Sequence, residues 1–371
     1  MNNKIHIVSF DVPSPPDYGG VIDIYFKIKS LFKIGLEIYL HIFKYGREED
    51  EELNKYCKKV YYYERTNSYL KILSTLPYIV ISRKNNKLIK NLILLNAPIL
   101  FEGLHTTYAL RNKEILKRKI LVRTHNIEHD YYKSLAKTEK KLFKKIFLLL
   151  EAIKLKSYEK ILDKSNFILS ISKKENDYFK KKYKPNTFYI PAFHSNNKIK
   201  NLSKKGYFAF YHGNLNVSDN IKAVEFLIDV FKTIDYPLVI AGKIEKSKFQ
   251  SQINKIKNIS FIQLENEKHL LDLLSRAHIN VLLSFQKTGV KLKLINSLFN
   301  SRFCVVNQNI IEGTNLDDLC FVGKNKLDFK RQIIQLINTE YLEEEIIKRK
   351  ILLQEFNNVK NAKKISQLLD N

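Results

Sequence analysis

Several residue types and patterns are scarce or absent in this sequence. It has no tryptophan, and its three cysteines, Cys57, Cys304 and Cys320, lie far apart along the chain. No CxxC pair or cysteine–histidine spacing typical of a zinc site occurs. The odd, low cysteine count fits a reducing compartment, so we expect a cytoplasmic protein.

Longer signatures of other protein classes are missing as well. No run of about 18 uncharged apolar residues occurs, so no membrane-spanning segment is expected. The chain start leads straight into an apolar strand, without the basic start and apolar stretch of a signal peptide. The sequence has no P-loop, no GxGxxG after its first strand and no DxD-like pair at a strand end. These absences count against P-loop enzymes, dinucleotide dehydrogenases and metal-dependent transferases.

The bulk composition that is present points to two domains. The chain has 371 residues, 44% of them hydrophobic, which suits two cores of about 150–200 residues each. Lysine and arginine total 64 against 38 aspartate and glutamate residues, a net charge of +26. Such a field attracts polyanions, namely nucleic acid, anionic lipid or phosphorylated substrates. Charge alone does not choose among them, and a compositional bias of the genome toward lysine would give the same excess.

Short apolar strands alternate with helical stretches along the whole chain, which predicts parallel sheets covered on both faces by helices. A polar, charged stretch at 196–206 is typical of a linker. We therefore predict an α/β protein with domains at 1–200 and 201–371, the final helix being free to pack back on the first domain. Strands are expected at 4–10, 37–43, 60–63, 99–101, 120–123 and 167–171, and then at 207–211, 238–241, 259–262, 279–283 and 303–306.

Ligands of such sheets bind beyond the carboxyl ends of the strands, where three loops of the first domain carry notable residues. Gly19 and Gly20 follow the first strand, and adjacent glycines let the backbone approach a phosphate or sugar. A tight turn is the structural alternative. Two further strands end in the polar runs RTHNIE and FEGLH. Two such ends together favour a functional site over satisfied structural histidines, and the candidates are Arg123, His125, Glu128, Glu102 and His105.

Three loops of the second domain carry the same kind of signal. Gly213 and Asn214 follow its first strand, and Lys243 ends the strand sequence IAGK. The strongest signal is the glycine loop Thr288-Gly289-Val290, after which Lys291 and Lys293 open a helix. Cations at a helix N-terminus oppose its dipole, and a bound diphosphate would reverse the sign of that effect. An ordinary exposed lysine is the alternative for Lys243.

Together these motifs resemble the retaining GT-B glycosyltransferases of family 4, also called group 1. The resemblance covers essentially the whole chain and rests on the order of the Gly19-Gly20 loop, RTHNIEHDYY, Ser170-Ile171-Ser172, YHGNLNVSDN, IAGK, and TGVKLKLINSL with RFCVVN. It implies two Rossmann-like parallel-sheet domains that face an interdomain cleft. The second domain would then hold a nucleotide sugar and the first domain the acceptor.

The resemblance also implies roles for single residues. It implies that His125 faces the transferred sugar. From the side chains themselves, Arg123 is expected to hold an anion and Glu128 to orient Arg123 or His125. Glu102 and His105 are the acceptor-binding candidates. Family members commonly carry two acidic residues where Gln286 and Asn296 stand here. The donor contacts would be Gly19, Gly20, Gly213, Asn214, Lys243, Thr288, Gly289, Lys291, Lys293 and Asn296.

The expected reaction is transfer of a hexosyl group from a nucleotide diphosphate sugar to a hydroxyl of a glycan or lipid-linked glycan, in cell-surface polysaccharide synthesis. Lysines and helix N–H groups would stabilise the leaving diphosphate, so neither a metal nor another cofactor is expected. One alternative is an inactive sugar-nucleotide-binding protein, because of Gln286 and Asn296. Others are a GT-B-like nucleotide-sugar epimerase and a nucleic-acid binder, although no nucleic-acid-binding motif is present.

Residues 139–160 form a basic helical pattern with seven lysines and interspersed large apolar residues. One interpretation is a surface helix that docks on an anionic membrane, which would suit a lipid-linked acceptor on the cytoplasmic side. The other is a solvated helix with one face on the core.

Overall fold

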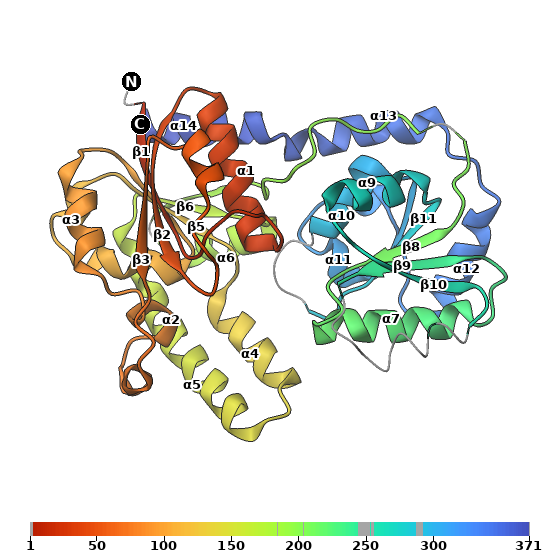
Figure 1. The fold of residues 1–371 in the computed structure, drawn as a ribbon, viewed down its shortest axis with the longest axis horizontal. Helices are drawn as coiled ribbons and strands as arrows, with labels where there is room; N and C mark the ends of the chain where they lie inside the picture. The colour runs from red at the N-terminus through yellow and green to blue at the C-terminus, as the bar shows by residue number, and fades with distance from the viewer. Residues whose placement is uncertain are drawn as a thin grey trace. The chain divides into compact units, whose positions relative to one another are not determined.

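The computed structural model describes residues 3–183, 185–202, 204–243, 253, 256–286 and 292–370. The chain divides into two compact units, Met1–Ser195 with Glu355–Asn371, and Asn196–Gln354. The chain passes from the first unit to the second after Ser195, at the start of the predicted linker. Its C-terminal segment, Glu355–Asn371, belongs to the first unit again (Figure 1).

The first unit is built on a seven-stranded parallel sheet of order β3-β2-β1-β4-β5-β6-β7. After β1 the chain adds β2 and β3 on one side, and then β4 to β7 on the other. The point where the order reverses, between β1 and β4, is where such sheets bind ligands. The strands are β1 (Lys4–Ser9), β2 (Glu37–Lys44), β3 (Lys59–Glu64), β4 (Ile99–Glu102), β5 (Ile120–Thr124), β6 (Phe167–Ser170) and β7 (Asn186–Tyr189).

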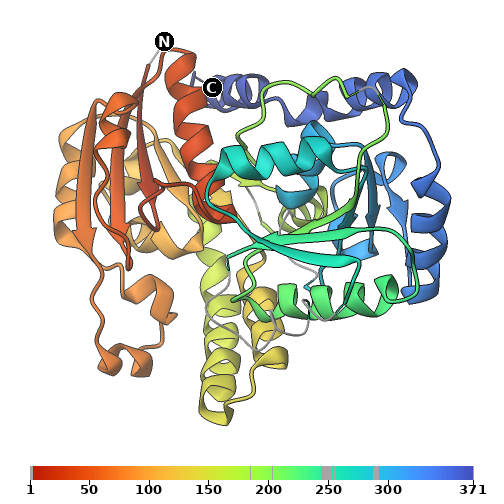
Figure 2. The ribbon, with the colours of Figure 1, turned by 45° about the vertical axis from the view of Figure 1, so that its right-hand side comes forward.

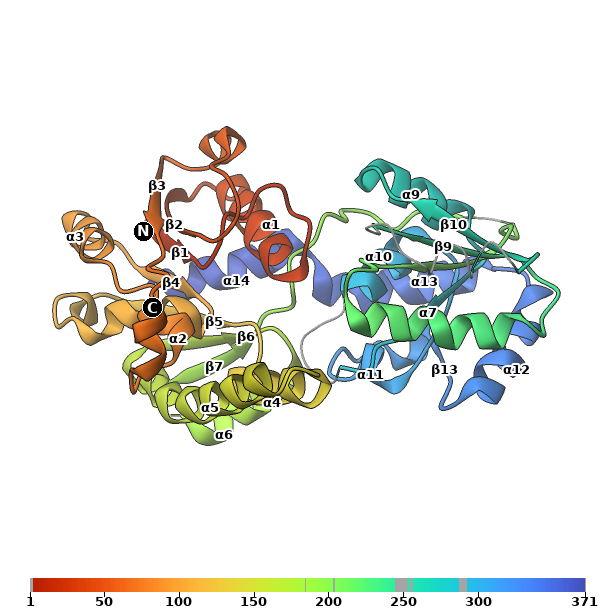
Figure 3. The same cartoon turned by 60° about the horizontal axis from the view of Figure 1, so that its bottom comes forward.

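Helices cover both faces of this sheet (Figure 3). One buried cluster joins α1 and α14 to the sheet through residues such as Ile24, Ile28, Ile365 and Leu369. The other joins α3, α5 and α6. The C-terminal helix thus packs against the first unit, beside α1. The helices are α1 (Gly19–Lys33), α2 (Tyr78–Ile81), α3 (Asn86–Leu94), α4 (Glu128–Thr138), α5 (Leu142–Tyr158), α6 (Lys173–Lys182) and α14 (Asn358–Asp370).

The second unit repeats the arrangement with a parallel sheet of order β10-β9-β8-β11-β12-β13. Its order reverses between β8 and β11. The short strand β13 was not predicted, because two residues are too few to form an apolar pattern. The strands are β8 (Ala209–His212), β9 (Leu238–Gly242), β10 (Ile259–Gln263), β11 (Ile279–Leu282), β12 (Phe303–Val306) and β13 (Phe321–Val322).

The helices of the second unit pack around one large apolar core, to which α7 contributes Val224, Leu227 and Phe231. The C-terminal part of the chain forms three helices, α12, α13 and α14. The helices are α7 (Ser218–Phe231), α9 (Glu267–Arg276), α10 (Leu292–Asn300), α11 (Gln308–Ile311), α12 (Lys326–Ile337) and α13 (Glu343–Leu352). Figure 2 shows these helices on both faces of the sheet.

The predicted fold class, two Rossmann-like parallel-sheet domains, is confirmed. Within the described residues, no helix combines the length and the hydropathy needed to cross a membrane. The cleft expected between the domains stays a prediction.

Candidate functional site

The loops after β1, β4 and β5 meet where the order of the first sheet reverses. Phe10, which follows β1, lies with its ring centroid 5.3 Å from that of His105 and 5.5 Å from that of His125. Gly20 makes room for this ring, because a Cβ there would lie 2.8 Å from its Cζ atom. No atom lies within 4 Å of a Cβ built at Gly19. The two predicted histidines are therefore brought to one place, and Gly20 serves their packing.

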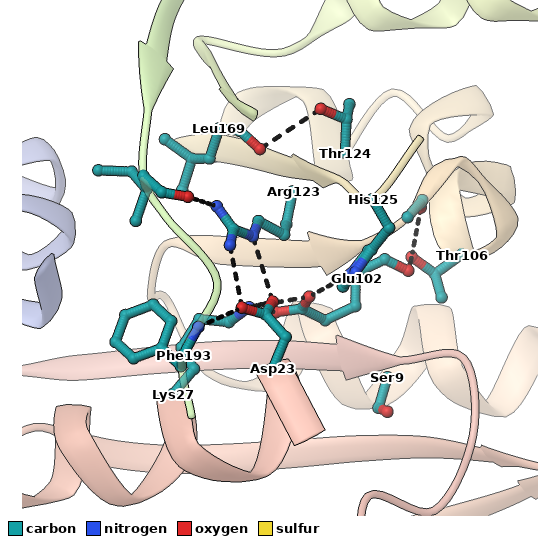
Figure 4. A network of polar contacts seen from close by, with 12 residues as sticks. Ser9, Asp23, Lys27, Glu102, Thr106, Arg123, Thr124, His125, Leu169 and Phe193 are labelled. Atoms are coloured by element: carbon teal, nitrogen blue, oxygen red, sulfur yellow. Dashed lines mark hydrogen bonds and ion pairs between the residues drawn. The ribbon is translucent and has the colours of Figure 1, made fainter. Parts of the chain in front are cut away.

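His125 is fixed by a carboxylate from the neighbouring strand. Its Nε2 atom lies 3.0 Å from Oε2 of Glu102, the last residue of β4 (Figure 4). The other Glu102 oxygen is 2.9 Å from the ammonium of Lys27, so Glu102 acts as a carboxylate. Because a carboxylate only accepts, this contact assigns the proton of a neutral ring to Nε2 and leaves Nδ1 with a lone pair. Among the described residues, none forms a hydrogen bond with Nδ1.

A second carboxylate completes the buried ionic network under His125. Asp23 lies 2.8 Å from the ammonium of Lys27 and 2.9 Å from the guanidinium of Arg123, and it also accepts from the Phe193 amide. All four charged side chains are fully buried. Burial opposes the ionisation of Asp23, but the charges of Arg123 and Lys27 outweigh it and hold the pKa of Asp23 well below its usual range.

The network corrects two roles expected from the sequence. Arg123 also donates to the carbonyls of Ile190 and Pro191, and its guanidinium is fully buried. A substrate anion does not fit such a side chain. Glu102 is equally buried, and its carboxylate contacts Lys27 and His125, so the expected direct contact with an acceptor does not fit it either.

Sequence reasoning missed Asp23 and Lys27, which lie one turn apart on the buried face of α1. The signal that could have identified them is an acid and a lysine placed among the apolar residues of the helix that follows Gly19 and Gly20. Together with Glu102 and His125, Asp23 also has the spacing of a metal site, with ligand atoms within 4.8 Å of one another. The cations of Lys27 and Arg123 already lie against these carboxylates and supply the positive charge that a metal ion would bring.

Glu128 does not take the orienting role that was expected. It is the first residue of α4, is 3% exposed, and forms no hydrogen bond or ion pair with His125 or Arg123 in the described chain. Burial, with the charge of Glu175 next, raises the pKa of Glu128 to about 8. Burial likewise raises the pKa of Glu175 to about 7. Glu128 is therefore mostly a neutral acid near pH 7, beside a second carboxyl that also protonates easily.

The FEGLH turn owes its glycine to local geometry. Gly103 has φ of 74°, and a Cβ there would lie 2.7 Å from Nδ1 of His105. Burial, followed by the charge of Arg83, holds the pKa of His105 well below its usual value, so its ring is neutral. Its Nδ1 atom is buried and has no partner among the described residues. His105 is thus a neutral group beside His125.

In the second unit, the loops after β8 and β9 fit closely together. A Cβ at Gly242 would lie 2.0 Å from the carbonyl oxygen of Gly213, so β9 must end in glycine. The amide of Asn220 donates to the Asn214 carbonyl at 2.9 Å and accepts from the Tyr211 hydroxyl at 3.1 Å. The loop after β8 is therefore fixed to the start of α7, and Lys243 follows Gly242 as an exposed side chain.

Positive charge lies next to this loop. Lys293, in the first turn of α10, places its ammonium 3.0 Å from the Leu283 carbonyl and 5.1 Å from the centroid of the Tyr211 ring. Burial, and then the charge of Lys293, lowers the pKa of His212 to about 3, so this histidine is neutral. Its Nδ1 atom is buried without a partner in the described part of the chain.

Two residues that were not predicted hold the loop after β11. Asp219 accepts from the Ser284 hydroxyl at 3.0 Å and from the Phe285 amide at 2.9 Å. Asn307 donates to the Ser284 carbonyl at 2.8 Å. Asp219 stands within the HGNLNVSDN run, and its place in the first turn of α7 was the available signal.

The remaining donor candidates divide into two groups. Asn296 accepts from the side chain of Asn196 at 2.8 Å, so its oxygen is engaged with the linker. Thr288, Gly289 and Lys291 lie outside the described residues.

Comparison with known proteins shows which structures and which family domain this chain is similar to. Staphylococcus aureus TarM, solved with UDP and alpha-GlcNAc-glycerol, aligns over 100% of both chains with a TM-score of 0.70 and 12% identity. Anabaena HepE, solved with UDP and glucose, aligns over 98% of this chain and 99% of its own, with a TM-score of 0.67 and 12% identity. Residues 207–339 match the family model described as glycosyl transferases group 1. The chain has the GT-B fold, and its second unit carries a group 1 glycosyl transferase domain. The chain is also 28% identical to a 44.6 kDa protein in the cps region of Klebsiella pneumoniae, described as uncharacterized, over 89% of the chain and 90% of that protein.

Proposed function

We propose that this glycosyltransferase transfers a hexosyl group from a nucleotide diphosphate sugar to a hydroxyl of a glycan or lipid-linked glycan, in cytoplasmic steps of polysaccharide synthesis. The observation that carries the proposal is the group 1 domain, in which the loop of Gly213 and Asn214 after β8 lies near Lys293, where the order of the second sheet reverses. The UDP bound to TarM and HepE and the cps-region relative support a nucleotide sugar and a polysaccharide product.

The donor would bind at the edge between β8 and β11. Breaking the anomeric bond builds negative charge on the diphosphate, and fixed cations and amide groups stabilise that charge. Lys293 and Lys243 supply the cations, while Gly213 lets the backbone approach the phosphates. We propose on this basis a metal-independent reaction, with retention of the anomeric configuration.

The acceptor would bind in the first unit, beside His125. The Glu102 contact fixes Nε2–H, so Nδ1 is the atom that takes a hydrogen bond or a proton from the acceptor hydroxyl. The acceptor oxygen then bonds to the anomeric carbon as the bond to the diphosphate breaks, on the same face from which the diphosphate leaves, so that the configuration is retained. Lys27 pairs with the other oxygen of Glu102 and thereby helps to hold this orientation of the ring.

The test begins with a donor screen. UDP-, GDP- and dTDP-sugars are compared by thermal shift, where a donor at a hundred times its dissociation constant adds about 2.7 kcal/mol of stability. The stabilising donor is then incubated with lipid-linked and soluble glycans, and the product is analysed by mass spectrometry and by NMR of the anomeric proton. Transfer with retained configuration is expected. A changed sugar that is still attached to its nucleotide would instead identify an epimerase, and donor binding without any product would identify an inactive binding protein.

His125→Gln tests the acceptor role. Turnover is expected to fall about 10²–10⁴-fold, the range of general base catalysis, while donor affinity and the melting temperature stay unchanged. His129→Gln is the matched control, because His129 lies on the same segment but contacts Tyr178 through its Nε2 atom. An equal loss of turnover in both variants would show that His125 has no specific role in the reaction.

A further inference from the structure

Helix α5 is apolar on two opposite sides. Its core side consists of Leu148, Ala152 and Leu155, which are at most 8% exposed. At about 3.6 residues per turn, the apolar residues of the other side project away from that core. These residues, which we call the α5 stripe, are Leu142, Phe143, Ile146, Leu149, Leu150 and Ile153, and they are 42–89% exposed.

A second exposed apolar segment lies beside the α5 stripe. Leu70 and Leu73, in the 3₁₀ helix Tyr69–Leu73, are 79% and 85% exposed. The ammonium of Lys154 on α5 donates to the Ile72 carbonyl at 2.7 Å, which ties this segment to the helix. In Figures 1 and 2 the orange loop before α2 and the yellow α4–α5 pair extend toward the same end of the first unit. Two elements thus present large apolar side chains to solvent together.

Lysines border the α5 stripe. Lys145 and Lys156 are exposed on one flank of the helix, and neither has an ion-pair partner in the described chain. Residues 139–160 contain seven lysines and three glutamates. Two of these glutamates, Glu151 and Glu159, are buried, and the third pairs with Lys144. The charge presented outward is therefore positive.

We propose that the α5 stripe, with Leu70 and Leu73, docks on an anionic lipid bilayer. An apolar ridge bordered by lysines is the pattern of helices that lie in the membrane interface, where the apolar side chains enter the acyl boundary and the lysine ammoniums reach anionic headgroups. A second copy of the chain fits less well, because a symmetric contact through the stripe would bring the two sets of lysines together.

The docking surface is joined to the candidate acceptor site. Helix α4 begins at Glu128, directly after the loop of His125, and packs along α5. A bilayer under α5 would thus lie at the end of the helix pair that starts at the acceptor site. The use of this surface, delivery of a lipid-held acceptor hydroxyl, rests on the proposed function, whereas the docking itself does not.

The test is co-sedimentation of the full chain with vesicles of phosphatidylcholine alone and with phosphatidylglycerol added. Binding is expected to rise with the anionic fraction and to fall as salt shortens the Debye length from about 30 to about 10 Å. Phe143→Ser with Ile153→Ser, and separately Lys145→Glu with Lys156→Glu, should each weaken binding at least about tenfold. All four side chains are exposed, so the fold should not suffer.

Matched controls lie on α3, on another side of the first unit. Leu94→Ser removes an apolar side chain that is 80% exposed, and Lys87→Glu with Lys90→Glu reverses two exposed lysines. Both controls should bind vesicles like the wild type.

Equal weakening by the α3 charge reversal would show that only the net charge acts, and would overturn the proposal. The proposal would also be overturned if the serine variant bound vesicles normally, or if the wild type stayed in the supernatant at low salt. Dimers that form without lipid and that Phe143→Ser disperses would point to a second copy of the chain instead, and would overturn it as well. Nucleotide-sugar binding, measured on the same variants, should be unchanged, so a failure of docking is distinguished from a failure of the proposed function.

Discussion

The two sheets have the same topology at their reversal points but hold their cations differently. We call the carboxyl ends of the strands at β1 and β4 the first edge, and those at β8 and β11 the second edge. In the first unit Lys27 and Arg123 are fully buried and paired with Asp23 and Glu102. In the second unit Lys243 is exposed, and Lys293 lies half-buried against a carbonyl and the Tyr211 ring. The first edge therefore compensates its charges internally, whereas the second presents the ammonium of Lys243 to solvent.

Desolvation explains why the two arrangements differ. A charge taken fully out of water needs an opposite charge and hydrogen bonds in return, and the network around Asp23 supplies both. A lysine that is to bind a diphosphate cannot be fully buried against a carboxylate before the ligand arrives. The first edge thus supports one histidine, and the second fits the proposed role of its lysines in meeting a diphosphate.

The largest expected effect comes from breaking the buried network. Asp23→Asn leaves Arg123 and Lys27 with one carboxylate between them, so the free energy of unfolding should fall by about 3–5 kcal/mol. Because the pKa of Asp23 is lowered in the folded state, its contribution is present above the unfolded pKa and is lost as the pH falls below about 4. Urea denaturation at pH 7 and pH 3.5 measures both effects.

Asp17→Asn is the matched control for this prediction. Asp17 also pairs with an arginine, Arg47, but its side chain is 46% exposed. This substitution should cost less than about 1 kcal/mol. If the two variants lose equal stability, the buried network is not the support we describe.

The second prediction concerns the neutral acid on α4. The pKa of Glu128 is raised to about 8, so the folded protein binds a proton that the unfolded chain releases near pH 4.5. Stability from this group is therefore present at low pH and is lost as the pH rises toward 8. Glu128→Gln imitates the protonated acid and should raise the free energy of unfolding at pH 8 by about 1–3 kcal/mol, with little change at pH 5.

Exposed Glu114→Gln serves as the control, since it pairs with Lys117 on the surface and should change stability equally at both pH values. A difference between Glu128→Gln and wild type that stays constant from pH 5 to pH 8 would contradict the burial of an acid there.

The fold followed from the sequence more fully than the site did. Strand positions could be predicted because each buried strand is a short apolar run, and the alternation with helices sets the parallel topology. The roles of Arg123 and Glu128 could not, because a polar run after a strand does not show which side chains turn inward. Asp23 and Lys27 were missed because the partners that complete their network, Glu102 and Arg123, lie 75 and 100 residues away along the chain.

The third prediction tests the second edge. Lys293→Met keeps the aliphatic packing on Tyr211 but removes the charge, so the affinity for the nucleotide sugar should fall at least about tenfold, or 1.4 kcal/mol. Lys243→Ala should act in the same direction. Lys257→Met is the control, because Lys257 precedes β10 at the amino end of the strands. Calorimetric titration gives the three affinities, and an unchanged value for both Lys293→Met and Lys243→Ala would remove these lysines from the donor site.

The smallest expected effect is that of a chelator. If Lys243 and Lys293 supply the charge that stabilises the leaving diphosphate, removal of divalent ions should change turnover less than about twofold. Turnover is measured in EDTA and in magnesium, for the wild type and for Lys293→Met. The variant is the informative arm, because a metal ion could replace part of the lost charge only where the lysine is missing. Rescue of Lys293→Met by magnesium, with an unaffected wild type, would sharpen the contrast between the two edges. A wild type that stops in EDTA would show instead that its own lysines do not provide enough charge.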